Sequence, residues 1–89
     1  MKEITRQVLV FGLVQGVGFR EKIRRKIEED GGVLKGVVGN LENGTVELIL
    51  QGPWNEFLKM VKWISSQIEV KEIYCSPHKH INSVGFKVK

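Results

Sequence analysis

The segment Gln15–Arg20, which reads Gln-Gly-Val-Gly-Phe-Arg, carries the residue types best suited to holding a phosphate. It lies between a predicted strand and a predicted helix, and such a junction exposes backbone N–H groups and a partial positive charge. Glycines at 16 and 18 let the backbone curve around an anion. Arg20 adds a permanently charged fork that fits phosphate oxygens. The expected phosphate-binding residues are Gln15, Gly16, Val17, Gly18, Phe19 and Arg20.

Spacing alone makes this a weak signal, because a bare Gly-x-Gly after a strand is more often a tight turn. The segment is not a dinucleotide-binding fingerprint, since no third glycine follows at the required distance. It is not a Walker loop either, since the chain has no Gly-Lys-Ser/Thr. The residues by themselves therefore leave both a turn and an anion-binding loop open.

The elements around this segment follow from hydrophobic periodicity. Residues 4–12 form an apolar run typical of a strand inside a sheet. A helix is predicted over residues 20–30, where Phe19, Ile23 and Ile27 make one apolar stripe, and Gly31-Gly32 is a plausible stop.

The second half of the chain repeats the alternation of strands and helix. Strands over residues 33–41 and 45–51 flank Asn43-Gly44, a strong hairpin signal because both residues tolerate positive φ. The remaining predicted elements are a helix over 53–67, opened by Pro53, and strands over 70–75 and 84–89. One apolar face of this helix is expected to carry Trp54, Phe57, Leu58, Val61, Ile64 and Ile68. This order predicts an α+β, ferredoxin-like βαββαβ sandwich with two helices on one face of a four- to five-stranded antiparallel sheet.

Length and composition agree with one domain over residues 1–89. The chain is 42% hydrophobic and 27% charged, a normal globular balance. Its one cysteine, Cys75, cannot form an internal disulfide, and we expect it to be buried in a strand. With no apolar run of about 20 residues and no signal-like start, a cytoplasmic location is expected. A net charge of +4 suits an anionic ligand.

Two longer strings resemble the signatures of the acylphosphatase family. Residues 12–20 resemble the first signature, which is highly specific. Residues 36–40, followed by Gly44, Val46 and Gly52, resemble the second, and residues 85–88 resemble the family's last strand. The resemblance covers nearly the whole chain. It implies an enzyme that hydrolyses the carboxyl–phosphate bond of acyl phosphates to a carboxylate and inorganic phosphate.

The resemblance also implies the roles of two side chains. Arg20 matches the arginine that binds the phosphoryl group together with the loop amides, and Asn40 matches the asparagine that orients the attacking water. Phosphoryl transfer from a good leaving group depends on positioning and charge stabilisation, so no general base, metal or cofactor is expected. The expected ligands are a small-molecule acyl phosphate and inorganic phosphate or another oxyanion. A monomer without nucleic-acid or membrane partners is expected.

Two positions depart from the family pattern and keep an alternative open. Val37 replaces a usual aromatic residue, and Gly39 replaces a longer, often basic one. A non-catalytic anion-binding protein with the same loop is the second hypothesis. A nucleic-acid binder is the third, favoured by the basic cluster at 22–26 but lacking the aromatic strand motif of RNA-binding modules. The acyl phosphate used in the cell is left undetermined, and carbamoyl phosphate carries the same linkage.

Overall fold

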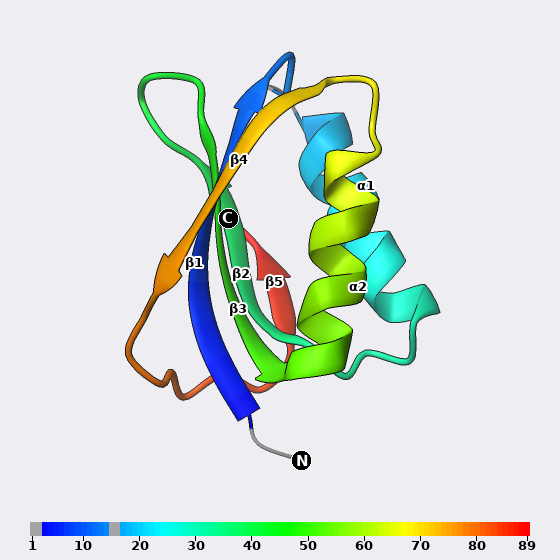
Figure 1. The fold of residues 1–89 in the computed structure, drawn as a ribbon, viewed down its shortest axis with the longest axis vertical. Helices are drawn as coiled ribbons and strands as arrows, with labels where there is room; N and C mark the ends of the chain where they lie inside the picture. The colour runs from blue at the N-terminus through cyan, green and yellow to red at the C-terminus, as the bar shows by residue number, and fades with distance from the viewer. Residues whose placement is uncertain (1–2, 15–16) are drawn as a thin grey trace.

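The computed structural model describes residues 3–14 and 17–89 and contains five strands and two helices. Figure 1 shows their arrangement. In chain order they are β1 (Glu3–Gly12), α1 (Val17–Glu29), β2 (Lys35–Asn40), β3 (Val46–Pro53), α2 (Trp54–Ser65), β4 (Val70–Pro77) and β5 (Phe86–Val88). The predicted ferredoxin-like order is therefore confirmed. Among the described residues, neither helix is long and apolar enough to cross a membrane.

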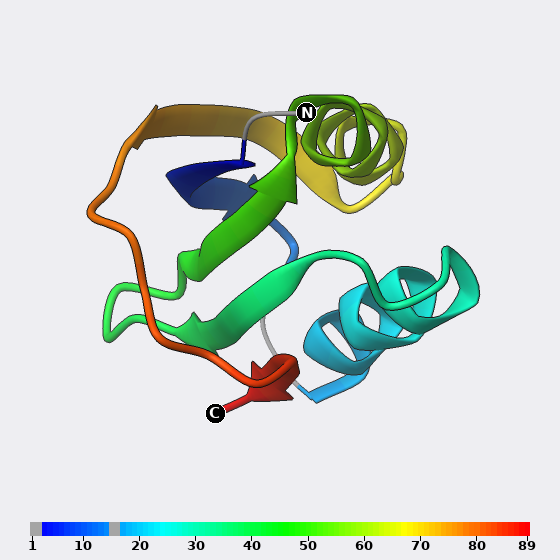
Figure 2. The same ribbon diagram turned by 90° about the horizontal axis from the view of Figure 1, so that it is seen from below.

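The sheet has the strand order β4-β1-β3-β2-β5 and is mixed, not purely antiparallel as expected. Pairs β1–β3, β1–β4 and β2–β3 are antiparallel, whereas β2 and β5 are parallel. The reason is the route of residues 78–85, which we call the strap. It leaves β4 at one edge, passes along the side of the sheet opposite the helices, and enters β5 at the other edge (Figure 2).

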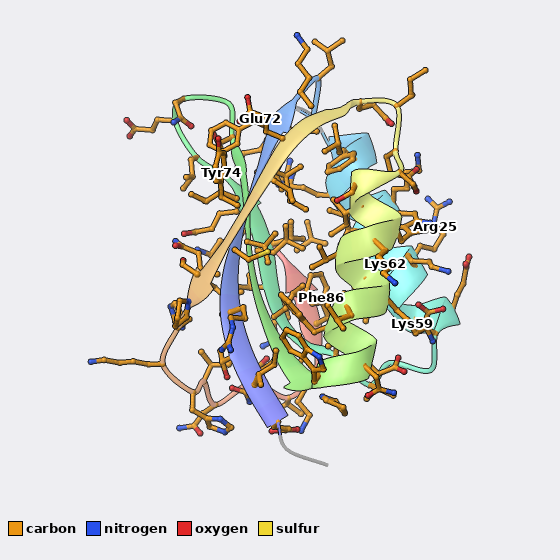
Figure 3. All side chains as sticks on the ribbon, viewed as in Figure 1. Arg25, Lys59, Lys62, Glu72, Tyr74 and Phe86 are labelled. Carbon is orange, nitrogen blue, oxygen red and sulfur yellow. The ribbon has the colours of Figure 1, made fainter. Side chains whose placement is uncertain are left out.

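Both helices cover the same face of the sheet, and the core lies between the two layers (Figure 2). Phe86 of β5 packs at the margin of this core (Figure 3). The fully buried side chains come from alternate positions of the inner strands and from one stripe of each helix. They include Val8, Val10, Val38, Val46, Leu48, Leu50, Ile23, Met60 and Ile64.

The predicted buried stripe of α2 is partly wrong. Phe57 and Ile64 are buried as expected, but Met60 takes a core position and Trp54 is 48% exposed. Ile68 is 97% exposed because α2 ends at Ser65, three residues earlier. The apolar periodicity ran past the end of the helix and so included a residue of the turn.

The ends of the elements correct several other expectations. Helix α1 begins at Val17, earlier than predicted, and stops as expected at glycines with φ of +97° and +66°, Gly31 and Gly32. Pro53 is the last residue of β3 and occupies the N-cap position of α2. The helix therefore begins at Trp54 and not, as predicted, at Pro53. Cys75 is exposed on the edge strand β4, not buried, because no further strand pairs with that edge.

Candidate phosphate-binding site

The loop after β1 is pinned at its start by a tight backbone approach. Gly12 has φ of +142°, and a Cβ there would lie 2.2 Å from the carbonyl oxygen of Glu69. The N–H of Leu13 donates to that same oxygen at 2.8 Å. Val14, which follows Leu13, is fully buried and its side chain lies in the core. The chain is therefore held firmly where it leaves β1. Gln15 and Gly16, both predicted to bind phosphate, lie outside the described residues.

The other predicted loop residues form the first turn of α1. The N–H groups of a first helical turn have no partner within the helix, and this turn carries no acidic residue. A Cβ on Gly18 would meet no atom of the described residues within 4 Å. Phe19 is only 5% exposed and belongs to the core, which leaves its backbone N–H as the only group it can offer to an anion.

Arg20 occupies the fourth position of α1 and has one anchored nitrogen and one unpartnered nitrogen. Its Nη1 donates a hydrogen bond to the carbonyl oxygen of Lys89. Its Nε is buried and has no hydrogen-bond partner among the described residues. Burying a donor of a charged group without a partner costs free energy. Such an atom in a native fold requires an explanation, and a bound anion is one.

Asn40 ends β2 and its residue is exposed to solvent. In the sheet register Val46 of β3 pairs with Asn40 on one side and with Val10 on the other. Asn40 therefore lies level with the last residues of β1, just before the loop. The N–H of Lys89 donates to the carbonyl oxygen of Val38 at 2.8 Å. Lys89 thus joins β2 to Arg20. The structure brings the predicted arginine and asparagine to the same end of the sheet.

The departure at Gly39 has a structural counterpart. A Cβ on Gly39 would lie 3.0 Å from Cδ and 3.2 Å from Cβ of Lys89. The side chain of Lys89 therefore lies over the glycine and fills the space that a longer residue at 39 would need. Lys89 follows β5, which pairs with β2 in register. The basic side chain that the sequence pattern lacks at position 39 is supplied by Lys89, the residue that follows β5.

Two contributors to the site escaped the sequence analysis. Lys89 and Glu69 hold Arg20 and Leu13 through backbone carbonyl oxygens, and a backbone contact leaves no mark on residue type. Glu69 also places Oε2 3.7 Å from the Nζ of Lys22 in α1. Its Oε1 is buried and, like the Nε of Arg20, is unpartnered within the described part of the chain.

Comparison with known proteins agrees with this geometry. The family model described as Acylphosphatase matches residues 6–88. A relative named acylphosphatase from Caldivirga maquilingensis is 38% identical, over 93% of this chain and 90% of its own length. Another from Burkholderia cenocepacia is 47% identical over 60 residues, but the aligned segment spans 59% of that relative's length.

A solved structure supports the fold independently. The structure of an acylphosphatase from Coxiella burnetii superposes with a TM-score of 0.85 at 33% sequence identity, covering 98% of this chain and 93% of that one. The family model extends across the loop, β2 and β5. This chain belongs to the acylphosphatase family.

Proposed function

We propose that the protein is an acylphosphatase, which hydrolyses the carboxyl–phosphate bond of acyl phosphates. The observation that carries the proposal is the Nε of Arg20. Among the described residues it is a buried donor without a hydrogen-bond partner, on a permanently charged group in the first turn of a helix. A phosphoryl oxygen at this place would satisfy the donor and meet the positive end of the helix dipole. Family membership supports the same conclusion.

In this proposal the phosphoryl group is bound by Arg20 and by the amides of residues 15–20. Arg20 is already oriented, because its Nη1 is held by the carbonyl oxygen of Lys89. Preorganised donors stabilise the charge on the equatorial oxygens of the transition state without reorganising during the reaction. A Cβ on Gly18 would meet no described atom within 4 Å, which is compatible with a ligand at the helix end.

Asn40 would orient the attacking water with its side-chain carbonyl oxygen and bind a phosphate oxygen with its NH₂ group. The water oxygen bonds to phosphorus while the bond from phosphorus to the carboxyl oxygen breaks. The carboxylate leaves with the bonding electrons, and the water's proton passes to a phosphate oxygen. Such a step needs no general base because the substrate itself accepts the proton, and no metal or cofactor is part of the proposal.

The proposal extends to the setting of the reaction. The substrate class is a small acyl phosphate, with carbamoyl phosphate included because it carries the same linkage. We propose that residues 1–89 act as one domain and as a monomer in the cytoplasm, as the lone cysteine and the composition suggest. Three of the four basic residues at 22–26 pair with acidic neighbours, as in the Arg24–Glu28 contact of 2.6 Å, which disfavours a nucleic-acid surface.

Hydrolysis of benzoyl phosphate, followed by its ultraviolet absorbance, tests the proposal. Arg20→Gln and Asn40→Ala should each lower kcat/KM by about 10²-fold or more, since one preorganised donor typically contributes that much. Arg25→Gln is the matched control because it removes the same charge from α1 at a position on the outer side of the helices (Figure 3). It should retain wild-type turnover.

The opposite result would change the assignment. A folded wild-type protein with no turnover above background would exclude the enzyme, and phosphate binding by calorimetry would then identify a non-catalytic anion-binding protein. Equal losses in Arg20→Gln and Arg25→Gln would show that general charge, and not this site, determines the rate.

A further inference from the structure

The strap is the longest irregular segment of the described chain, and it is fixed to the sheet at a few points. His78 donates its backbone N–H to the carbonyl oxygen of Thr5 at 3.1 Å. At the far end Gly85 accepts a hydrogen bond from the N–H of Gly36 at 2.9 Å. Between these ends a single side chain, Gln51 of β3, holds the middle of the strap at Ile81.

The amide of Gln51 makes hydrogen bonds on both of its ends. Its Nε2 donates to the carbonyl oxygen of Ile81 at 3.0 Å, and its Oε1 accepts from the N–H of Ile81 at 2.8 Å. The same Oε1 accepts from Oγ1 of Thr5 at 2.7 Å. Gln51 is 3% exposed and Thr5 is 5% exposed. A buried amide satisfied in this way fixes one conformation of the segment that it contacts.

The strand that follows the strap is short, and it is otherwise fixed by its pairing with β2 and by the packing of Phe86 and Val88 against the core. β5 has three residues, lies at the edge of the sheet and pairs with β2 alone. Immediately after it comes Lys89, whose N–H is bonded to Val38 and whose carbonyl oxygen accepts from Arg20. With Ile81 held, the strap consists of two short segments, 78–81 and 81–85, each fixed to the sheet at both ends. Without it, the chain from 78 to 85 becomes one longer free loop, which costs more entropy to close.

We propose that Gln51 is a positioning residue for Arg20, acting through the strap, β5 and the carbonyl oxygen of Lys89. It touches no substrate, and it lies on the third strand of the sheet, whereas Arg20 lies in α1. Its contribution is to keep β5 in the one placement in which the Lys89 carbonyl orients the guanidinium. The inference rests on the proposed function of Arg20.

Gln51→Met tests this inference because it keeps the length of the side chain and removes both bonds to Ile81. We expect kcat/KM for benzoyl phosphate to fall roughly 3- to 30-fold, the range of coupling found for residues that act at a distance. Thr5→Val is the matched control, since it deletes one buried hydrogen bond of the same network and leaves both strap bonds intact. It should lose some stability and retain activity, since the strap stays fixed at Ile81.

A double-mutant cycle separates positioning from general destabilisation. In an Arg20→Lys background, Gln51→Met should cause little further loss, because the guanidinium that it orients is gone. Full additivity of the two losses would overturn the proposal. Should Gln51→Met fold poorly, Gln51→Glu retains the acceptor for the Ile81 N–H and lacks only the donor to the Ile81 carbonyl, and the same cycle applies.

Nuclear magnetic resonance keeps this test independent of turnover. In Gln51→Met the amide of Lys89 should exchange faster with solvent and the Nε–H signal of Arg20 should shift, whereas Thr5→Val should change neither. If wild type does not hydrolyse acyl phosphates but these signals respond, the proposed function fails and the positioning role stands. If turnover is normal and both signals are unchanged in Gln51→Met, the positioning role is refuted.

Discussion

Replacing Arg20 with methionine should separate stability from function. The change removes the charged hydrogen bond from Nη1 to the Lys89 carbonyl oxygen, and bonds to charged groups contribute about 1.5–3 kcal/mol. It also removes the buried Nε, which has no partner in the described part of the chain and whose desolvation costs about 1–3 kcal/mol. The two effects have opposite signs and similar size. The free energy of unfolding without ligand should therefore change by less than about 1.5 kcal/mol.

Phosphate should reveal what the arginine contributes. Wild type at a phosphate concentration 100 times its Kd should gain about 2.7 kcal/mol in the free energy of unfolding. Arg20→Met should gain almost none, and its turnover should be lost. Urea denaturation with and without phosphate, monitored by tryptophan fluorescence, measures both quantities. A loss above about 3 kcal/mol without ligand would show that Nε has a stabilising partner, and equal phosphate stabilisation in both proteins would refute the site.

Two further predictions follow from the edges of the site and of the sheet. Gly12→Ala should lower both stability and activity, because its Cβ would lie 2.2 Å from the Glu69 carbonyl oxygen. Gly85→Ala is the matched control, because Gly85 has a similar φ of +137° and its Cβ would meet no described atom within 4 Å. A larger loss at Gly12 in urea denaturation isolates the clash, and equal losses would contradict it. Partial burial of the thiol raises the pKa of Cys75, an effect that the charge of Arg6 only partly offsets. Less thiolate is then present at neutral pH, so alkylation by iodoacetamide should be slower than in the urea-unfolded chain and should accelerate only above the usual thiol range. Equal rates in the folded and unfolded protein would refute the shift.

The sequence predicted the elements well wherever a local pattern determines them. The apolar residues at alternate positions 46, 48 and 50 placed β3, and the glycine pair at 31–32 placed the end of α1. The predictions were wrong where the pairing direction or the exposure of a residue depends on another part of the fold and not on the local sequence. The parallel pairing of β5 depends on the path of the strap, and the exposure of Cys75 depends on β4 being an edge.

The candidate site divides in the same way. The resemblance to two family signatures predicted Arg20 and Asn40, and the structure brings them to one end of the sheet. Lys89 and Glu69 could not be predicted, because each acts through a carbonyl oxygen that every residue possesses. Gly39 appeared as a weakness of the second signature, and only the packing of the Lys89 side chain above it explains the small residue.

The parallel pairing of β5 with β2 has a consequence for how the protein acquires its activity. The pair joins residues about fifty positions apart in sequence, and such non-local contacts slow folding because the chain between them must be closed into a loop. The orienting contact of Arg20 comes from the residue that follows β5. Helix α1 and the loop therefore do not hold the arginine by themselves, and competence for phosphate requires that the last strand has found its place beside β2.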